Sequence, residues 1–484
     1  MVTYWQYYSE FFKVHPGSRT LMLFRTPVTP LFFGALFDWF GSTGVQVVLS
    51  ILYVLCLLAV WAIGAKLSVW VGFLSLILLG ADIQYFYWFF SVGSESPQSF
   101  LVVLWAAYAF FTFRCVKPRY WIVHAAIVWL LILNRPGNQV MVLCALFPLL
   151  NMQVVWKRRL LLFLVFLLSY GSCHVSYSLF NYLRVGSFQI STLGNAHMPF
   201  YRLYLQDALI SPDNGPRSRE FEHLVEKNIL SLEEFENYRI NKDIFFNIPT
   251  QRMYNHIVQT VADVYGWDHQ WLLLRQVSVE SFLRHPGEFF LTYLDHLRDV
   301  FYVRGDGRFD LSRHNRTRPD YKTFLKKRYE LYGQLGLPLP SEGDLLPAPP
   351  KRAPQKSIED YTAKTLWGLK AAPSAWTFPD LRCTYHWGDI FDIYGVKFPF
   401  TFLFIIIGII GTVFSMMRKT TADFLAISSI FSVSFLTLAA TLMGSVQQPF
   451  RFPFDSVFIL LGCFGLHGML RPLTNHSLQS MVDG

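Results

Sequence analysis

The sequence predicts a mainly α-helical membrane protein, a polytopic bundle of about nine spans with one large outward-facing domain between the sixth and the seventh span. Composition is the first observation behind this class. Of the 484 residues, 52% are hydrophobic and 15% are charged, whereas about a quarter of the residues are charged in soluble domains. The second observation is that the apolar residues gather into runs long enough to cross a hydrocarbon layer of about 30 Å.

The predicted spans fall into two groups along the chain. Six precede a long polar segment and three follow it, at roughly 43–65, 67–90, 98–113, 119–134, 138–152, 160–182, 396–417, 422–445 and 450–470. We therefore expect five regions: an outward amino-terminal loop with an interfacial helix (1–42), membrane helices (43–183), an outward or lumenal domain (184–393), membrane helices (394–471) and a cytoplasmic tail (472–484).

The basic residues of the short loops predict the orientation. They fall on one side of the expected membrane, at Lys66, Arg114, Lys117, Arg119, Lys157, Arg158, Arg159, Arg418, Lys419 and Arg471. Loops rich in Lys and Arg stay in the cytoplasm, so this side is cytoplasmic. We expect a bacterial inner membrane, or the endoplasmic reticulum in a eukaryote. The net charge of +9 fits this topology and contact with anionic headgroups, so no nucleic-acid partner is expected.

This orientation has a consequence for the amino terminus. It places the first 28 residues outside, although they carry Lys13, Arg19 and Arg25 and have no signal peptide. A basic tail is hard to translocate by itself. We therefore expect that a helix preceding Met1 is missing from this reading frame.

Charged side chains stand at the outer ends of several predicted spans, where they are costly and therefore indicate function. The first three along the chain have a simpler explanation: an interfacial anchor helix, a capped helix start and a solvated turn, respectively. Together they place cations and a carboxylate on one membrane face, which suits an anionic headgroup, because guanidinium groups bind phosphate oxygens in pairs. The stretches are 24–41 with Arg25, 91–100 with Glu95, 133–139 with Arg135 and 447–465 with Arg451 and Asp455.

The order of these stretches resembles the GT-C superfamily of polytopic glycosyltransferases, which use polyprenyl-phosphate-linked sugars and include the dolichyl-phosphate-mannose protein mannosyltransferases. The likeness covers 1–200 and 395–470, and it depends on the order and sidedness of short, degenerate motifs. These motifs are RTPVTP (25–30), Ser94-Glu95-Ser96, Arg135-Pro136, NYLRVGSFQISTLGN (181–195) and Arg451-Phe452-Pro453.

The resemblance implies roles for single residues. Arg451 would bind the lipid phosphate or a diphosphate leaving group, Pro453 would start the last helix, and Asp455 would lie in its first turn. Tyr4 matches a tyrosine that follows the family's first-loop acid, so that acid would fall at or before Met1. Candidate catalytic carboxylates are Glu10 and Glu95, and candidate substrate-binding residues are Tyr4, Arg25, Arg135, Arg451 and Asp455.

Three functions follow as hypotheses. The first is a membrane glycosyltransferase that moves a sugar from a polyprenyl-phosphate donor to a lipid, glycan or protein acceptor on the outer face, with the need for a divalent metal left open. The second is a catalytically inactive scaffold homologue, which the missing acid favours. The third is a lipid-linked glycan transporter. Transporters place charges near the bilayer midplane, whereas here they cluster at one face, although Asp82 lies within the second apolar run.

Overall fold

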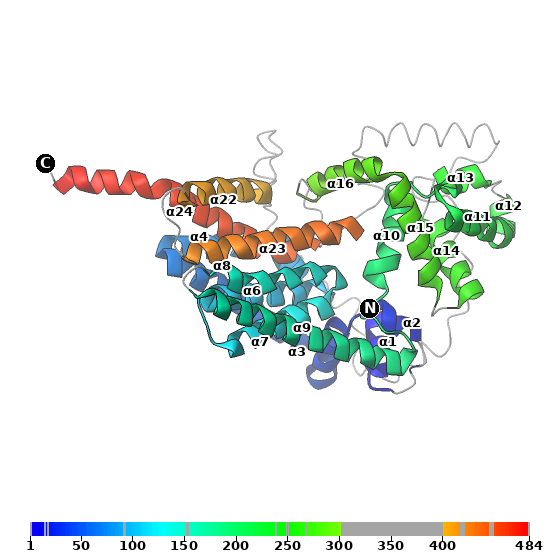
Figure 1. Ribbon diagram of the computed structural model, residues 1–484, viewed down its shortest axis with the longest axis horizontal. Helices are drawn as coiled ribbons and strands as arrows, with labels where there is room; N and C mark the ends of the chain where they lie inside the picture. Colours follow the sequence, from blue (N-terminus) through cyan, green and yellow to red (C-terminus); the bar gives the residue numbers. More distant parts are fainter. Residues whose placement is uncertain are drawn as a thin grey trace.

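In the computed structural model (Figure 1) the described residues form helices and no strand. The expected mainly α-helical class is therefore confirmed for this part of the chain. The last part of the expected outward domain, 302–393, lies outside the description. The structure describes residues 2–482 apart from 14–15, 17–18, 91–92, 152–153, 238–239, 248, 250, 267–268, 302–399, 417–421 and 445–449.

Three helices in the described residues are long and apolar enough to cross a membrane. They belong to α3 (Val28–Leu67), α9 (Trp156–Val185) and α23 (Ala422–Gly444). The qualifying stretches, Thr43–Leu67, Trp156–Val185 and Leu425–Gly444, overlap three of the predicted spans. The count of nine spans includes shorter helices and stays a prediction.

A glycine divides α3 into two parts. Gly41 has φ 64° and ψ −170°, a conformation that glycine adopts without the steric strain of a side chain. The first part, Val28–Gly41, is a short apolar helix, and the second part continues to Leu67. The expected interfacial helix within 1–42 therefore corresponds to this first part, which ends at Gly41.

Two predicted spans have a different local structure from the one expected. The run 67–90 is broken into α4 (Val69–Gly80) and α5 (Ile83–Phe89). The Asp82 carboxylate accepts a hydrogen bond from the backbone N–H of Tyr85 at 3.1 Å. This contact caps the start of a new helix. The run 138–152 forms a 3₁₀ helix, η1 (Pro136–Leu146), followed by the short α8 (Phe147–Leu150). In the first run the polar residue Asp82 precedes the new helix α5, and in the second Pro136 and Gly137 begin η1.

The remaining helices of the bundle pack side by side (Figure 1): α6 (Glu95–Thr112), α7 (Pro118–Asn134), α22 (Phe400–Met416) and α24 (Phe452–Val482). Small residues allow the closest approach. A Cβ atom on Gly411 would collide with the backbone of Gly465, and a Cβ on Gly462 would collide with Phe404. Such glycine contacts are typical of helix pairs packed within a membrane.

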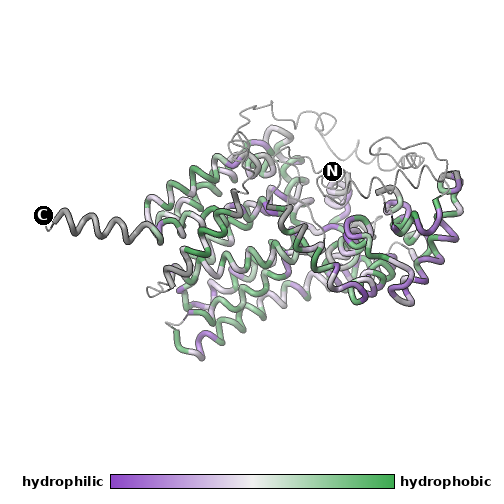
Figure 2. Tube along the Cα trace, turned by 90° about the horizontal axis from the view of Figure 1, so that it is seen from above, coloured by the Kyte–Doolittle hydropathy of each residue, from purple (hydrophilic) through white to green (hydrophobic). Residues whose placement is uncertain are grey.

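A second group of helices forms its own hydrophobic core beyond the bundle. Its buried residues run from Phe200 to Phe289, and Figure 1 shows it at the opposite end from the carboxyl terminus. Figure 2 shows the bundle mostly in hydrophobic colours and this group with mixed ones. We call it the outer helical unit. It comprises η2 (Leu193–His197), α10 (Met198–Tyr201), η3 (Arg202–Gln206), η4 (Pro212–Asn214), α11 (Pro216–Asn228), α12 (Glu233–Asn237), α13 (Lys242–Asn247), α14 (Gln251–Tyr265), α15 (Gln270–Arg284) and α16 (Pro286–Phe301).

The amino-terminal helices α1 (Val2–Glu10) and α2 (Arg19–Phe24) are anchored to the bundle. The rings of Trp5 and Phe37 meet edge to face with centroids 4.9 Å apart. Arg184, in the last turn of α9, donates a hydrogen bond from Nη2 to the carbonyl oxygen of Glu10 at 2.8 Å. These contacts fix the position of α1, and with it Tyr4, against the bundle.

Candidate functional site

A cavity of about 550 Å³ lies where the amino-terminal segment, the bundle and the outer helical unit meet. The bundle contributes the start of α3, the start of α6, the end of α7 and the end of α23. The predicted outward loops precede or follow these same helix ends. The lining residues are Tyr4, Arg25, Thr26, Thr29, Ser94, Glu95, Asn134, Arg135, Pro136, Gly137, Leu193, Met198, Pro199, Leu203, Arg275, Ser278, Val279, Phe282, Phe289, Ala440, Thr441, Met443, Gly444 and Phe450.

The cavity brings together four of the seven predicted site residues. Tyr4, Arg25, Glu95 and Arg135 all line it, although up to 131 positions of sequence separate them. Glu10, Arg451 and Asp455 are not among the lining residues. Their proposed roles stay predictions, because their positions alone do not test them.

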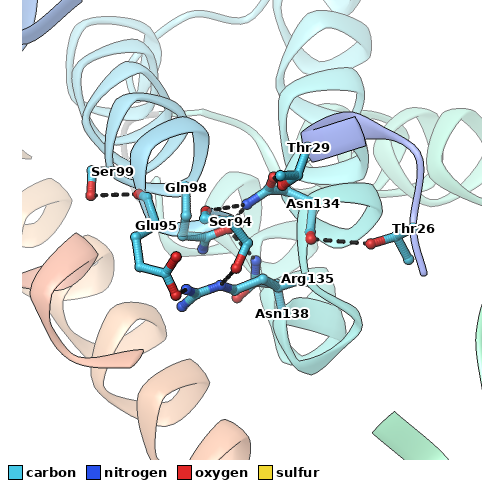
Figure 3. Close-up of polar contacts among 9 residues, drawn as sticks. All are labelled: Thr26, Thr29, Ser94, Glu95, Gln98, Ser99, Asn134, Arg135 and Asn138. Atoms are coloured by element: carbon cyan, nitrogen blue, oxygen red, sulfur yellow. Dashed lines mark hydrogen bonds and ion pairs between the residues drawn. The ribbon is translucent and has the colours of Figure 1, made fainter. Parts of the chain in front are cut away.

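Glu95 and Arg135 form an ion pair at the floor of the cavity (Figure 3). Arg135 Nη2 lies 2.6 Å from Glu95 Oε1, and Arg135 Nε donates to Ser94 Oγ at 3.0 Å. The side chains are only 8% and 15% exposed. Glu95 opens α6, where the helix dipole favours a carboxylate. Burial lowers the pKa of Arg135, and the charge of Glu95 opposes this shift.

A network of buried amides holds this ion pair in place (Figure 3). Asn134 donates to Gln98 Oε1 at 2.9 Å and to the carbonyl oxygen of Ser94 at 3.0 Å. Asn138 donates to the same Gln98 oxygen at 2.9 Å, and Thr29 donates to Asn134 Oδ1 at 2.7 Å. These hydrogen bonds restrain the side chains that they join, while Gln98 Nε2 is buried without a hydrogen-bond partner. The Glu95 carboxylate itself is held by Arg135.

Tyr4 and Arg25 lie together on the amino-terminal side of the cavity. The Arg25 guanidinium carbon is 4.9 Å from the centroid of the Tyr4 ring, a cation–π contact. Burial raises the pKa of Tyr4 above its usual value of about 10, and the positive charge of Arg25 partly opposes this. Tyr4 is therefore a neutral hydrogen-bond donor at physiological pH. The Arg25 Nε atom is buried without a hydrogen-bond partner.

The facing wall of the cavity is mostly apolar and comes from the outer helical unit and α23. It includes one cation that sequence analysis missed, Arg275 in α15. No motif surrounds Arg275, and nothing in the sequence distinguishes it from other arginines of the polar segment. The amides Gln98, Asn134 and Asn138 were also missed, although polar residues at the ends of apolar runs give a signal that could have found them.

Arg451 and Asp455 form a second buried pair, which is not among the residues that line the cavity. Arg451 Nε is 3.2 Å from Asp455 Oδ1, and the side chains are 8% and 0% exposed. Arg451 Nη1 also donates to the carbonyl oxygen of Val300 at 2.9 Å. α24 begins at Phe452 and carries Asp455 in its first turn, so the expected helix start at Pro453 is confirmed to within one residue.

Glu10, the other candidate catalytic carboxylate, is the last residue of α1, and its side chain is buried. Within the described residues no group of three or more His, Cys, Asp or Glu side chains is arranged to hold a metal ion. Comparison with known proteins finds no family model, no curated protein and no solved structure that matches the chain.

Proposed function

We propose that this protein is a membrane glycosyltransferase that transfers a sugar from a polyprenyl-phosphate donor to an acceptor on the outer or lumenal face. One observation carries the proposal. Arg25, Glu95 and Arg135 come from three separate motifs that resemble those of the GT-C superfamily, Tyr4 matches the tyrosine of its first-loop pattern, and all four line one cavity. Motifs that are far apart in the sequence and meet at one cavity support a shared role.

The membrane arrangement belongs to the same proposal. We place about nine spans in the membrane, with the cavity at their outer ends and the outer helical unit outside. The three long apolar helices support this arrangement. So do the cavity-lining ends of α6, α7 and α23, because the basic loops predict that these ends face outward. The membrane is the bacterial inner membrane, or the endoplasmic reticulum in a eukaryote.

The cavity has a polar side and an apolar side, as an amphiphilic donor requires. The polar side offers a carboxylate, hydroxyls and amides for a sugar, and the Arg25 guanidinium for a phosphate. The opposite wall offers Leu193, Met198, Val279, Phe282 and Phe289 to the first part of a prenyl chain. Ligand sites commonly combine an apolar lining with a few fixed polar groups in this way.

The reaction we propose is a direct displacement at the anomeric carbon of the donor sugar. The acceptor oxygen forms a bond to this carbon, and the bond from the carbon to the phosphate oxygen breaks. The proton of the acceptor passes to the Glu95 carboxylate, and the electron pair of the broken bond leaves with the lipid phosphate. Glu95 is the stronger candidate for the base because it lines the cavity, whereas Glu10 does not. Proton transfer to a positioned carboxylate accelerates such reactions by about 10²–10⁴-fold.

The inactive-scaffold hypothesis is the second candidate, and one observation favours it. One oxygen of the Glu95 carboxylate is already occupied by Arg135 Nη2 at 2.6 Å, so the catalytic proton would have to reach the other oxygen or displace this contact. In this case the cavity would bind a lipid-linked sugar without transferring it.

A transfer assay separates the two candidates. The full chain in lipid nanodiscs is given a polyprenyl-phosphate donor with a radiolabelled sugar, together with membranes of the source organism as acceptor. We expect label to enter the acceptor fraction, and Glu95→Gln to reduce the rate at least 100-fold. Glu288→Gln is the matched control, because Glu288 is an exposed carboxylate outside the cavity lining. Equal rates for wild type and Glu95→Gln would contradict the catalytic role.

A further inference from the structure

Two of the arginines that the motifs nominated already have a carboxylate partner. Arg135 is paired with Glu95 at 2.6 Å, and Arg451 is paired with Asp455 at 3.2 Å. An opposite charge at this distance in a buried place offsets most of the field that a ligand would feel. Neither guanidinium therefore presents a full positive charge to an anion in the cavity.

Arg25 differs from these two arginines because no carboxylate in the described ranges offsets its charge. None of the carboxylates that the structure describes forms an ion pair with it, and its Nε–H is buried without an acceptor. Its neighbours are the rings of Tyr4 and Phe24, with centroids 4.9 and 5.0 Å from the guanidinium carbon. A buried donor without a partner is costly, and a bound anion would satisfy it.

Arg275 supplies a second uncompensated charge from the other side of the cavity. It lies in α15, where Arg275, Ser278, Val279 and Phe282 all line the cavity. Their spacing of three, one and three residues puts them on one face of the helix. In the described part of the chain no carboxylate pairs with Arg275, whose side chain is exposed. One helix face thus presents a cation, a hydroxyl and two apolar side chains.

We propose that Arg25 and Arg275 together bind the doubly charged phosphate monoester of a prenyl lipid, with the prenyl chain beside Val279 and Phe282. Both side chains line the same cavity of about 550 Å³, so one ligand can contact both. The outer helical unit therefore supplies half of the anion site. Arg275 is the specificity-determining residue that no motif nominated.

This inference rests on the proposed function and defines the charge state that the site selects. The donor phosphate is a diester with one negative charge. When the bond to the sugar breaks, the leaving lipid phosphate becomes a monoester with two. Two uncompensated guanidinium groups match the second state better than the first. Cations placed where charge develops stabilise the transition state more than the bound donor.

Ligands of different charge test this selectivity. The full chain in nanodiscs is titrated at pH 8 with farnesyl phosphate, farnesyl methyl phosphate and farnesol, which carry about two, one and no negative charges at this pH. We expect wild type to bind the dianion at least 10-fold more tightly than the monoanion. Arg275→Gln and Arg25→Gln should each reduce this preference to less than 3-fold, and Arg25→Lys should keep part of it.

The matched control is Arg284→Gln, which removes an exposed arginine from the same helix but outside the cavity lining. It should leave the preference unchanged. Equal losses in Arg284→Gln and Arg275→Gln would overturn the proposal, and so would a wild type without charge preference. Inorganic phosphate bound as tightly as farnesyl phosphate would overturn the lipid part.

The same titration separates this inference from the proposed function. A charge preference that depends on Arg25 and Arg275, in a protein that transfers no sugar, would support the anion site and contradict the glycosyltransferase. Sugar transfer by a protein whose Arg275→Gln variant keeps the full charge preference would support the enzyme and overturn the anion site.

Discussion

The two buried Arg–carboxylate pairs of the bundle differ in what surrounds them. The Glu95–Arg135 pair lines the cavity and is held by Ser94 and by amides that are themselves hydrogen-bonded. The Arg451–Asp455 pair is at least as buried, with exposures of 8% and 0%, but it is not part of the lining and contacts the backbone of α16. A similar sequence signal, an arginine one or two residues before a proline at the end of a predicted span, therefore lies in the cavity lining in one place and outside it in the other.

The two pairs also have consequences for the stability of the fold. Removing one partner leaves an uncompensated charge, whereas replacing both by apolar groups is often neutral or stabilising. We therefore expect single changes at either pair to lower stability, and changes at Glu95–Arg135 to lower activity as well.

The largest expected effect comes from reversing the Glu95–Arg135 pair. Exchanging the two residues keeps the ion pair but moves the carboxylate from the start of α6 to position 135. The group that we propose as the base is then out of position. We expect sugar transfer to fall by about 10³-fold, which corresponds to about 4 kcal/mol in the activation barrier. The measurement is the transfer rate with labelled donor. A variant that keeps its thermal stability and a tenth or more of the wild-type rate would contradict the assignment of Glu95.

The next effect is on stability at the other pair. Asp455→Ala leaves Arg451 buried without its carboxylate, so we expect the free energy of unfolding to fall by about 3–5 kcal/mol. The double variant Arg451→Met with Asp455→Leu should recover most of this loss. Unfolding of the purified protein in mixed micelles measures both. If the double variant is as unstable as the single one, the pair has a role beyond charge compensation.

A smaller effect is expected where the cavity floor meets α23. A Cβ on Gly137 would lie 2.8 Å from Thr441 Oγ1, so Gly137→Ala forces η1 and α23 apart and destabilises the protein by about 1–3 kcal/mol. Gly171→Ala is the control, because no atom lies within 4 Å of the Cβ position there. Thermal unfolding of the two variants compares them directly, and equal melting temperatures would rule out a tight contact at Gly137.

The smallest expected effect concerns Tyr4. Tyr4→Phe removes one neutral hydrogen-bond donor from the cavity, which is worth about 0.5–1.5 kcal/mol. Affinity for farnesyl phosphate should therefore fall by about 2- to 12-fold. Because burial raises the pKa of Tyr4, the phenol stays protonated, and the wild-type affinity should not change through its ionisation between pH 7 and 9. A step in affinity in that range that disappears in Tyr4→Phe would contradict the neutral state.

Much of the fold could be predicted from the sequence, because a long apolar run and a glycine each determine the structure of their own short segment. The runs 43–65, 160–182 and 422–445 correspond to long apolar helices, and Gly41 ends the expected helix. The break at Asp82 and the 3₁₀ helix at 136–146 were not predicted. Both depend on hydrogen bonds and close contacts that hydropathy does not report.

The candidate site was predicted in part, for a related reason. Arg25, Glu95 and Arg135 stand at or just before the predicted outer ends of helices, and the predicted sidedness brings such ends to one face. Arg275 could not be found this way, because it lies within a helix of the outer helical unit and reaches the cavity only through the packing of α15. Sequence spacing gives no information on contacts of that kind.

The most direct test is a structure of the protein in nanodiscs with a bound donor analogue whose bridging oxygen is replaced by a methylene group. We predict that its phosphonate lies against Arg25 and Arg275, its anomeric carbon faces Glu95, and its prenyl chain runs along Val279 and Phe282. An analogue bound at Arg451 and Asp455, with the cavity empty, would contradict the placement of the site.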